Sequence, residues 1–147
     1  MAPQFHFRKI QTSDYDFWSK ELSVPDSLQH FEKLVSLLAL EEEQNRSYSF
    51  IFEVESKPVG FFQVFDVLSV PERSGKIEIS IAKSMQRRGY GKVCITFLED
   101  FCFKQLDLKS LISIIRLENK ASIALFESLG YEFKTTEGFW LKSSDQT

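Results

Sequence analysis

The sequence has few residues that could link distant segments covalently or bind a metal. Only two of its 147 residues are cysteine and only two are histidine. Cys94 and Cys102 fall on one predicted helix, about 12 Å apart along its axis, whereas a disulfide needs Cα atoms within about 7 Å. His6 and His30 lack the spacing of metal ligands. We therefore expect two buried thiols in a reducing compartment, and no metal site.

Long apolar runs are also missing. The sequence has no stretch of about 18 apolar residues, the length that crossing a membrane requires, and no charged-then-apolar leader. These features predict a soluble, cytoplasmic protein with no membrane partner. The formal net charge of −3 argues against nucleic acid as the main partner.

Glycine and proline are few, at six and four residues, whereas phenylalanine occurs 15 times. No stretch reads as a linker or an internal repeat, and the length suits one domain, which we place at 1–147. The ordinary explanation for the phenylalanines is an aromatic-rich core, and a hydrophobic binding groove is the alternative.

The hydrophobic pattern switches repeatedly between the period of a strand and that of a helix. The expected order is β-α-α-β-β-β-α-β-α-β-β. Strands are predicted at 5–10, 47–55, 59–68, 76–81, 110–115, 131–134 and 139–142. Helices are predicted at 15–18, 25–43, 89–105 and 119–129. The second and third strands should form an antiparallel hairpin with a turn at 56–58, and Gly60 suggests a bulge.

The clearest functional motif lies between a predicted strand and a predicted helix, and it reads Gln86-Arg87-Arg88-Gly89-Tyr90-Gly91-Lys92. The first N–H groups of a helix have no partner within it, and the helix dipole places partial positive charge there. Gly89 and Gly91 let a phosphate approach the backbone. The motif therefore predicts an anion site, to which Arg87, Arg88 and Lys92 add positive charge.

Two glycines do not identify the phosphate ligand. The dinucleotide fingerprint needs a third glycine and an acidic residue about 20 positions further on, and a Walker A loop needs Gly-Lys-Ser/Thr. The motif has neither. A nucleotide-binding module of another kind stays a competing hypothesis, although no magnesium carboxylate is evident.

Two stretches together resemble the GNAT superfamily of acyl-CoA-dependent N-acyltransferases. Residues 79–81, followed by the 86–92 motif, are similar to the family's cofactor motif. Residues 119–131 resemble its Asn-x-x-Ala-x-x-x-Tyr/Phe-x-x-x-Gly-Phe/Tyr signature. With the element order, the resemblance covers about 5–142. It implies an α/β (α+β) fold with a mixed, mostly antiparallel central sheet, helices on both faces and splayed central strands.

The resemblance also implies acetyl-CoA as co-substrate and a role for each matching residue. The pyrophosphate would bind the N–H groups of Arg87, Arg88, Gly89, Tyr90, Gly91 and Lys92. The pantetheine arm would pair with Ile79 and Ile81 in the gap beside 110–115, as an added strand pairs with an edge. An N–H of Ile79 or Ser80 would polarise the thioester carbonyl. Asn119 would bind the arm, act as a plain N-cap, or do both.

The family often supplies a tyrosine as proton donor for the leaving thiolate, and that position is Phe126 here. Asn119 and Phe126 are two helical turns apart, so we expect both to face the arm, with the ring packed on the sulfur. The thiolate would then take its proton from another group or leave unassisted, since a free thiol has a pKa of about 8.5. Tyr131 is expected to pack in the core or at its rim.

Glu78 is the first candidate for the general base. Strand alternation places Glu78 and Ser80 on the face opposite Ile79, just ahead of the expected acetyl site. Glu78 could take a proton from the ammonium, through a water. The alternative is a solvated or ion-paired strand residue. Asp66 is the second candidate, with a simple turn residue as its alternative.

The resemblance places the first two helices beside the acceptor cleft, with Trp18, Phe31 and the loop 23–25 in that wall. It implies direct transfer of an acetyl group, in a ternary complex, to a primary amine of a small molecule or a protein. The enzyme would be a monomer or a homodimer. A non-catalytic module of the same fold that binds acetyl-CoA as a sensor or partner domain is the alternative.

Overall fold

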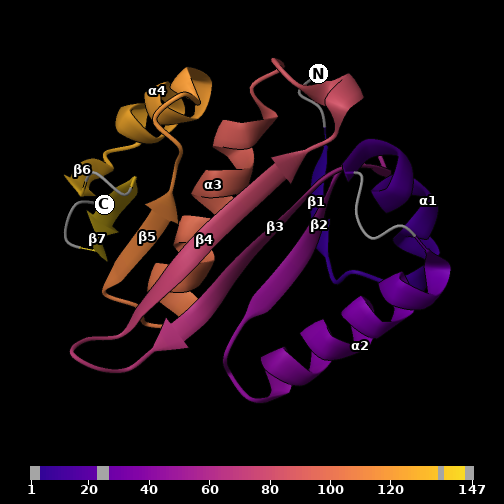
Figure 1. The fold of residues 1–147 in the computed structure, drawn as a ribbon, viewed down its shortest axis with the longest axis horizontal. Helices are drawn as coiled ribbons and strands as arrows, with labels where there is room; N and C mark the ends of the chain where they lie inside the picture. Colours follow the sequence, from indigo (N-terminus) through magenta and orange to yellow (C-terminus); the bar gives the residue numbers. More distant parts are fainter. Residues whose placement is uncertain (1–3, 23–26, 136–137, 145–147) are drawn as a thin grey trace.

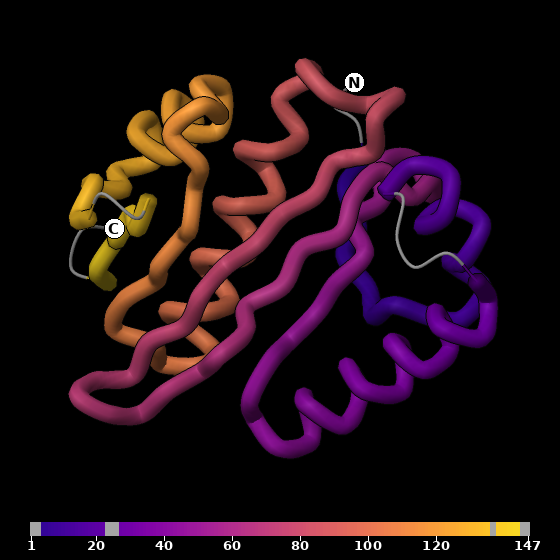
Figure 2. Tube along the Cα trace, in the orientation of Figure 1, coloured from indigo at the N-terminus to yellow at the C-terminus, as the bar shows by residue number. Residues whose placement is uncertain are grey.

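The computed structural model describes residues 4–22, 27–135 and 138–144. Its strands form one seven-stranded sheet in the order β1-β2-β3-β4-β5-β7-β6 (Figures 1 and 2). The strands are β1 (Phe5–Arg8), β2 (Tyr48–Val54), β3 (Lys57–Leu68), β4 (Ser74–Ile81), β5 (Ser110–Ile114), β6 (Glu132–Thr135) and β7 (Phe139–Ser143). Neighbours are antiparallel except β4 and β5, which are parallel. The predicted mixed, mostly antiparallel sheet is therefore confirmed.

The helices follow the predicted order. They are α1 (Tyr15–Phe17), which continues into the π-helical turn η2 (Trp18–Leu22), then α2 (Leu28–Glu43), α3 (Tyr90–Asp100), which continues into the π-helical turn η4 (Phe101–Gln105), and α4 (Lys120–Ser128). Short 3₁₀ turns form η1 (Thr12–Asp14) and η3 (Lys83–Met85). Ser27 caps α2 by accepting a hydrogen bond from the His30 N–H, so α2 begins at Leu28.

Two hydrophobic cores lie on opposite faces of the sheet. Phe50 and Phe52 of β2 pack on one face, with α3 and α4. Ile51, between them, packs on the other face with Trp18 and Phe31 of η2 and α2. Because successive strand residues point to opposite faces, a strand buried on both sides reads as a continuous apolar run. The predicted helices on both faces and the aromatic-rich core are confirmed.

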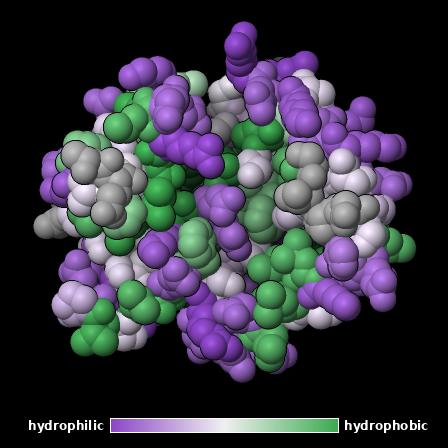
Figure 3. Space-filling model, in the orientation of Figure 1, coloured by the Kyte–Doolittle hydropathy of each residue, from purple (hydrophilic) through white to green (hydrophobic). Residues whose placement is uncertain are grey.

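The surface carries both hydrophobic and hydrophilic side chains. On the face drawn in Figure 3, exposed hydrophobic groups are separated by hydrophilic side chains. Cys94 and Cys102 are free, buried thiols on the core side of α3 and η4, and burial raises the pKa of both. No helix in the described ranges is long and apolar enough to cross a membrane.

The hairpin between β2 and β3 differs from the prediction by about one residue. The turn lies at Glu55 and Ser56, whose φ angles are 50° and 66°, and β3 already begins at Lys57. The pairing shifts between Phe52 and Glu53 of β2, so the bulge lies next to Gly60. A Cβ on Gly60 would stand 2.8 Å from the Ser80 carbonyl oxygen, which explains why glycine is required there.

The two parallel strands separate halfway along β4. Their pairing runs from Ser74 with Ser110 to Ile77 with Ser113 and stops there. Beyond that point β4 continues on β3 alone, as far as the pairing of Ile81 with Gly60, while β5 pairs with β7 on its other side. Figure 1 shows the two strands diverging, with α3 behind the gap. The predicted splay is confirmed, and it leaves one edge of β4 without a strand partner.

Candidate active site

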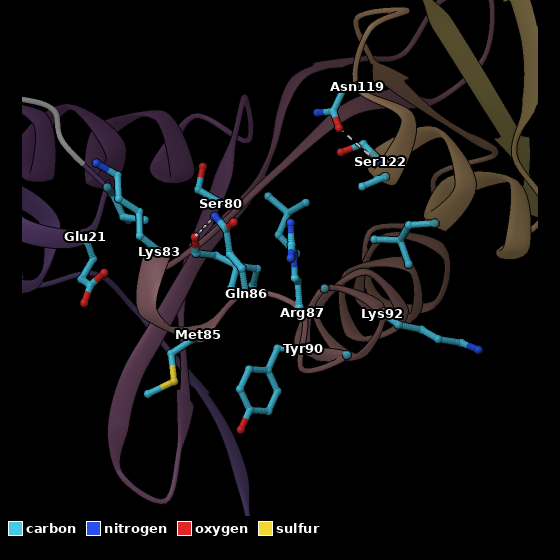
Figure 4. A pocket seen from close by; sticks show the side chains of 17 residues that line it. Glu21, Ser80, Lys83, Met85, Gln86, Arg87, Tyr90, Lys92, Asn119 and Ser122 are labelled. Carbon is cyan, nitrogen blue, oxygen red and sulfur yellow. Dashed lines mark hydrogen bonds between the residues drawn. The ribbon is translucent and has the colours of Figure 1, made fainter.

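A cavity of about 680 Å³ lies along the part of β4 that β5 leaves (Figure 4). This volume is within the range of small-molecule sites, about 300–1,000 Å³. Most of the cofactor residues predicted from the sequence line it, namely Ile79, Ser80, Ile81, Arg87, Gly89, Tyr90, Gly91, Lys92 and Asn119. Residues that the sequence did not single out complete the wall, namely Glu21, Leu22, Lys83, Met85, Gln86, Ala121, Ser122 and Leu125.

The start of α3 forms one end of this cavity. Gly89 is the N-cap, with φ 81°, and no side chain caps the helix, whereas α2 and α4 are both capped by a side chain. A Cβ on Gly89 would meet nothing within 4 Å, so glycine is needed for the left-handed backbone. Arg87 also has a positive φ, 66°, which is uncommon for a residue with a side chain. The turn thus leaves the first N–H groups of α3 without a side-chain acceptor.

Positive charge collects at the same end of the cavity. Lys83, Arg87 and Lys92 line it, and within the described residues none of them forms an ion pair with a carboxylate. In Figure 4, Arg87 extends toward the space between β4 and α4, while Lys92 points outward. Glu21 is the one described carboxylate in the lining, and it accepts hydrogen bonds from the Ser84 N–H (3.3 Å) and hydroxyl (2.8 Å). Such an end suits an anion.

Asn119 stands across the cavity from Ser80 (Figure 4). Its Oδ1 accepts a hydrogen bond from the Ser122 N–H at 3.2 Å, so the side chain is the N-cap of α4. Its backbone N–H donates to the Arg116 carbonyl, and its carbonyl accepts from the Ile123 N–H. The Nδ2 amide is therefore the donor that Asn119 has left for a ligand.

Phe126 does not line the cavity in this structure. From α4 the lining is made by Asn119, Ala121, Ser122 and Leu125. The Phe126 ring is 4% exposed and packs edge-on against Tyr131 in the core, with ring centroids 4.9 Å apart. A Cβ on Gly91 would stand 3.2 Å from Leu125 Cδ2, so the glycine lets α3 and α4 approach closely at this point. Contact between Phe126 and a ligand stays a prediction.

Tyr131 lies in the core, as expected for the residue that follows Gly130. Burial, together with the nearby Glu99 carboxylate, raises its pKa. Glu99 forms a buried ion pair with Lys142, whose Nζ lies 3.2 Å from the carboxylate. Tyr131 is 3% exposed and does not line the cavity.

Three other predicted residues lie outside the large cavity. Arg88 is exposed beside it. Asp66 lies within β3, at the irregularity in its pairing with β4, has φ 49° and pairs with Lys76 at 3.2 Å, so it is a strand residue and not the expected turn residue. Glu78 is exposed on β4 and accepts a hydrogen bond from Gln63 Nε2 at 3.4 Å.

Glu78 borders a second, smaller cavity of about 180 Å³ on the α2 face of the sheet. Its lining consists of Trp18, Leu22, Leu34, Leu38, Phe61, Gln63, Glu78 and Ser80. Leu22 and Ser80 also line the large cavity, so the two cavities meet at the end of β4. Of the predicted acceptor wall, Trp18 lines the small cavity, Phe31 is fully buried beside Trp18, and 23–25 lie outside the described residues.

The cavities contain no evident metal site. In the part of the chain that the structure describes, no group of three or more histidine, cysteine, aspartate or glutamate side chains could hold a metal ion. The donors present are backbone N–H groups, lysine and arginine, which suit phosphate groups.

Residues 7–131 match the Acetyltransferase (GNAT) family, and the chain belongs to this family. A search of curated proteins found no match. The fold is similar to Mycobacterium smegmatis RimJ in complex with CoA-disulfide, with a TM-score of 0.87, 17% identity, and coverage of 97% of this chain and 83% of that one.

The fold is also similar to spermidine N-acetyltransferase SpeG from Vibrio cholerae. The F149G mutant gives a TM-score of 0.81 at 17% identity, with coverage of 97% of this chain and 95% of that one. A chimera of SpeG and hSSAT gives a TM-score of 0.77 at 20% identity, with 97% of each chain covered. These neighbours, all at or below 20% identity, show the GNAT-like fold.

Proposed function

We propose that this protein transfers an acetyl group from acetyl-CoA to a primary amine by direct attack in a ternary complex. The observation that carries the proposal is the meeting of the two cavities at Ser80. The large cavity includes the uncapped N-terminus of α3, which suits a phosphate group, and the small cavity is bordered by the Glu78 carboxylate. A thioester at the junction would be within reach of an amine from the α2 side.

In this proposal the pyrophosphate binds the N-terminus of α3, at Gly89 to Lys92, with Arg87 beside it. The arm extends along Ile79 to Ile81, where β4 has no β5 partner, and adds to the sheet edge as a strand would. Asn119 donates from Nδ2 across the cavity. The edge of β4 beyond Ile77 and the uncapped helix support this placement, although the Ile81 carbonyl already accepts a hydrogen bond from Gln86 Nε2 at 3.2 Å.

The chemistry needs a neutral amine and a polarised carbonyl. Glu78 accepts a proton from the ammonium, directly or through a water, and the nitrogen lone pair then forms the C–N bond. A backbone N–H of Ile79 or Ser80 stabilises the oxyanion. The attacking nitrogen, cationic after the C–N bond forms, loses its second proton to solvent, and when the tetrahedral intermediate collapses the C–S bond breaks, so that a neutral amide forms and the CoA thiolate leaves. The thiolate takes a proton from solvent or from a donor other than Phe126.

Glu78→Gln tests the assignment of the base. We expect turnover to fall by about 10²–10⁴-fold, the usual contribution of general acid–base catalysis, while acetyl-CoA still raises the melting temperature. Glu132→Gln is a matched control, because Glu132 is an exposed strand glutamate outside both cavities. Unchanged turnover with Glu78→Gln would remove Glu78 from the mechanism.

Thiol release from acetyl-CoA with a panel of amines tests the proposed function itself. Release with any primary amine supports the transferase. A melting temperature raised by acetyl-CoA without thiol release for any amine would favour the non-catalytic, acetyl-CoA-binding module.

A further inference from the structure

The small cavity described above is asymmetric in polarity. Its helical side is apolar, with Trp18 and Leu22 from η2 and Leu34 and Leu38 from α2. Its polar groups are all on the strands, where Gln63 of β3 is the cross-strand neighbour of Glu78 of β4. A ligand that fits this arrangement has an apolar body and one positively charged end.

The volume limits the apolar body. The cavity holds about 180 Å³. An apolar cavity of about 150 Å³ binds benzene, so this one holds a single six-membered ring or a short branched alkyl chain. A fused two-ring system is too large unless the walls move. Phe61 is 7% exposed and Trp18 also 7%, so two of those walls are themselves packed in the core.

The charge of the lining limits the amine to one ammonium. Glu78 is the one carboxylate among the described residues that line the small cavity. Glu21 lines the neighbouring large cavity, where it accepts hydrogen bonds from Ser84, and it does not line the small one. A second ammonium would lie against Leu34, Leu38 and Trp18, where a buried, unpaired charge is strongly disfavoured. A carboxylate on the acceptor would be repelled by Glu78.

We propose that the acceptor is a monocationic primary amine with one aryl ring or a short branched alkyl chain. Its body lies among Trp18, Leu34 and Phe61, and its nitrogen lies at Glu78. This inference rests on the proposed function and identifies the acceptor class for the same site. It predicts that spermidine, which has several charges along an extended chain, is a poor acceptor.

Matched amines test charge and size separately, with the full chain, saturating acetyl-CoA and thiol release as the readout. Hexylamine and 1,6-diaminohexane differ in one charge, and 2-phenylethylamine and 2-(1-naphthyl)ethylamine differ in one ring. We expect kcat/KM to be at least tenfold higher for the first amine of each pair, and higher for 2-phenylethylamine than for spermidine. A diamine or spermidine that reacts as well as the monoamines overturns the inference and leaves the transferase standing. If no amine reacts, both the proposed function and the inference are overturned.

Leu34→Glu tests whether this cavity decides the preference. Leu34 lines the small cavity, and a glutamate there would give a second ammonium a partner. The ratio of kcat/KM for hexylamine to kcat/KM for 1,6-diaminohexane should therefore fall at least threefold. Leu40→Glu is the matched control, because Leu40 is on the same helix, is 46% exposed and lines neither cavity. If the ratio of the two kcat/KM values is the same in Leu34→Glu and Leu40→Glu, the small cavity does not decide the preference.

Leu34→Phe provides a second test that does not depend on burying a charge. The larger ring fills part of the cavity, so kcat/KM for 2-phenylethylamine should fall at least tenfold relative to methylamine. The rise in melting temperature with acetyl-CoA should stay as in the parent. An unchanged ratio between the two amines would place the acceptor elsewhere.

Discussion

Substitutions of Gly89 distinguish two reasons for a glycine at the start of α3, namely the left-handed backbone and the approach of a phosphate group. Gly89 has φ 81° and open space around its missing Cβ, so any substitution pays a backbone cost of about 1–2 kcal/mol but meets no steric obstacle. Gly89→Asn and Gly89→Asp have side chains of the same size, and both tolerate this backbone region better than other residues. Only the aspartate adds negative charge where we place the pyrophosphate.

The electrostatic difference between the two variants can be estimated. At about 5 Å, two unit charges repel by about 1 kcal/mol in water and by about 3 kcal/mol at an effective dielectric constant of about 20. These values correspond to about 5-fold and about 150-fold in Kd. Gly89 is exposed, which weakens the repulsion, but the N-terminus of α3 would hold the phosphate charge close to residue 89. We therefore expect CoA to bind at least tenfold more weakly to Gly89→Asp than to Gly89→Asn.

Calorimetric titration of CoA into both variants measures the difference, and the unfolding midpoint of each reports the shared backbone cost. The effect should shrink as salt is added, because an exposed charge is screened. If the two variants bind CoA equally well at low salt, the phosphates do not lie at Gly89, and the assignment of this turn to the cofactor fails.

Three further predictions concern ligand binding, the core and pH. Acetyl-CoA at about 100 times its Kd should stabilise the protein by about 2.7 kcal/mol, and no thermal shift at millimolar concentration would contradict the cofactor assignment. Phe126→Tyr should keep or raise turnover, provided that the hydroxyl finds room. Phe126→Ala should lower the free energy of unfolding by about 3–5 kcal/mol, because the ring is buried. If the Phe126→Ala variant folds, binds acetyl-CoA and keeps its turnover, the ring does not face the thioester. Burial raises the pKa of the Cys94 and Cys102 thiols, so above a pH of about 8.5 the thiols ionise only in the unfolded chain. Their contribution to stability is therefore complete below that pH and is lost as the pH rises above it. Urea titrations at pH 7 and pH 9.5 should show the lower stability at pH 9.5, and replacing both cysteines by alanine should reduce the difference.

The sequence by itself determined the local features of this protein. The alternation in β4, the Ser27 and Asn119 caps, and the turn 86–92 all depend on residues within a few positions of one another. Such patterns act over one strand or one helical turn, so they can be read without knowing what lies opposite. The family motifs belong to the same class of information, and most of the residues that they predict for the cofactor line the large cavity.

Contacts between distant segments decided the rest. The pairing of β4 with β5 ends at Ile77, whereas β5 pairs with β7 along its whole length, and no residue of β4 encodes that point alone. Which residues of α4 line the large cavity was also decided by packing, since Leu125 lines it beside Gly91 of α3 while Phe126 packs on Tyr131 in the core. The small cavity joins η2, α2, β3 and β4, whose residues become neighbours only when the chain folds, and therefore the place that we propose for the acceptor depends on tertiary structure.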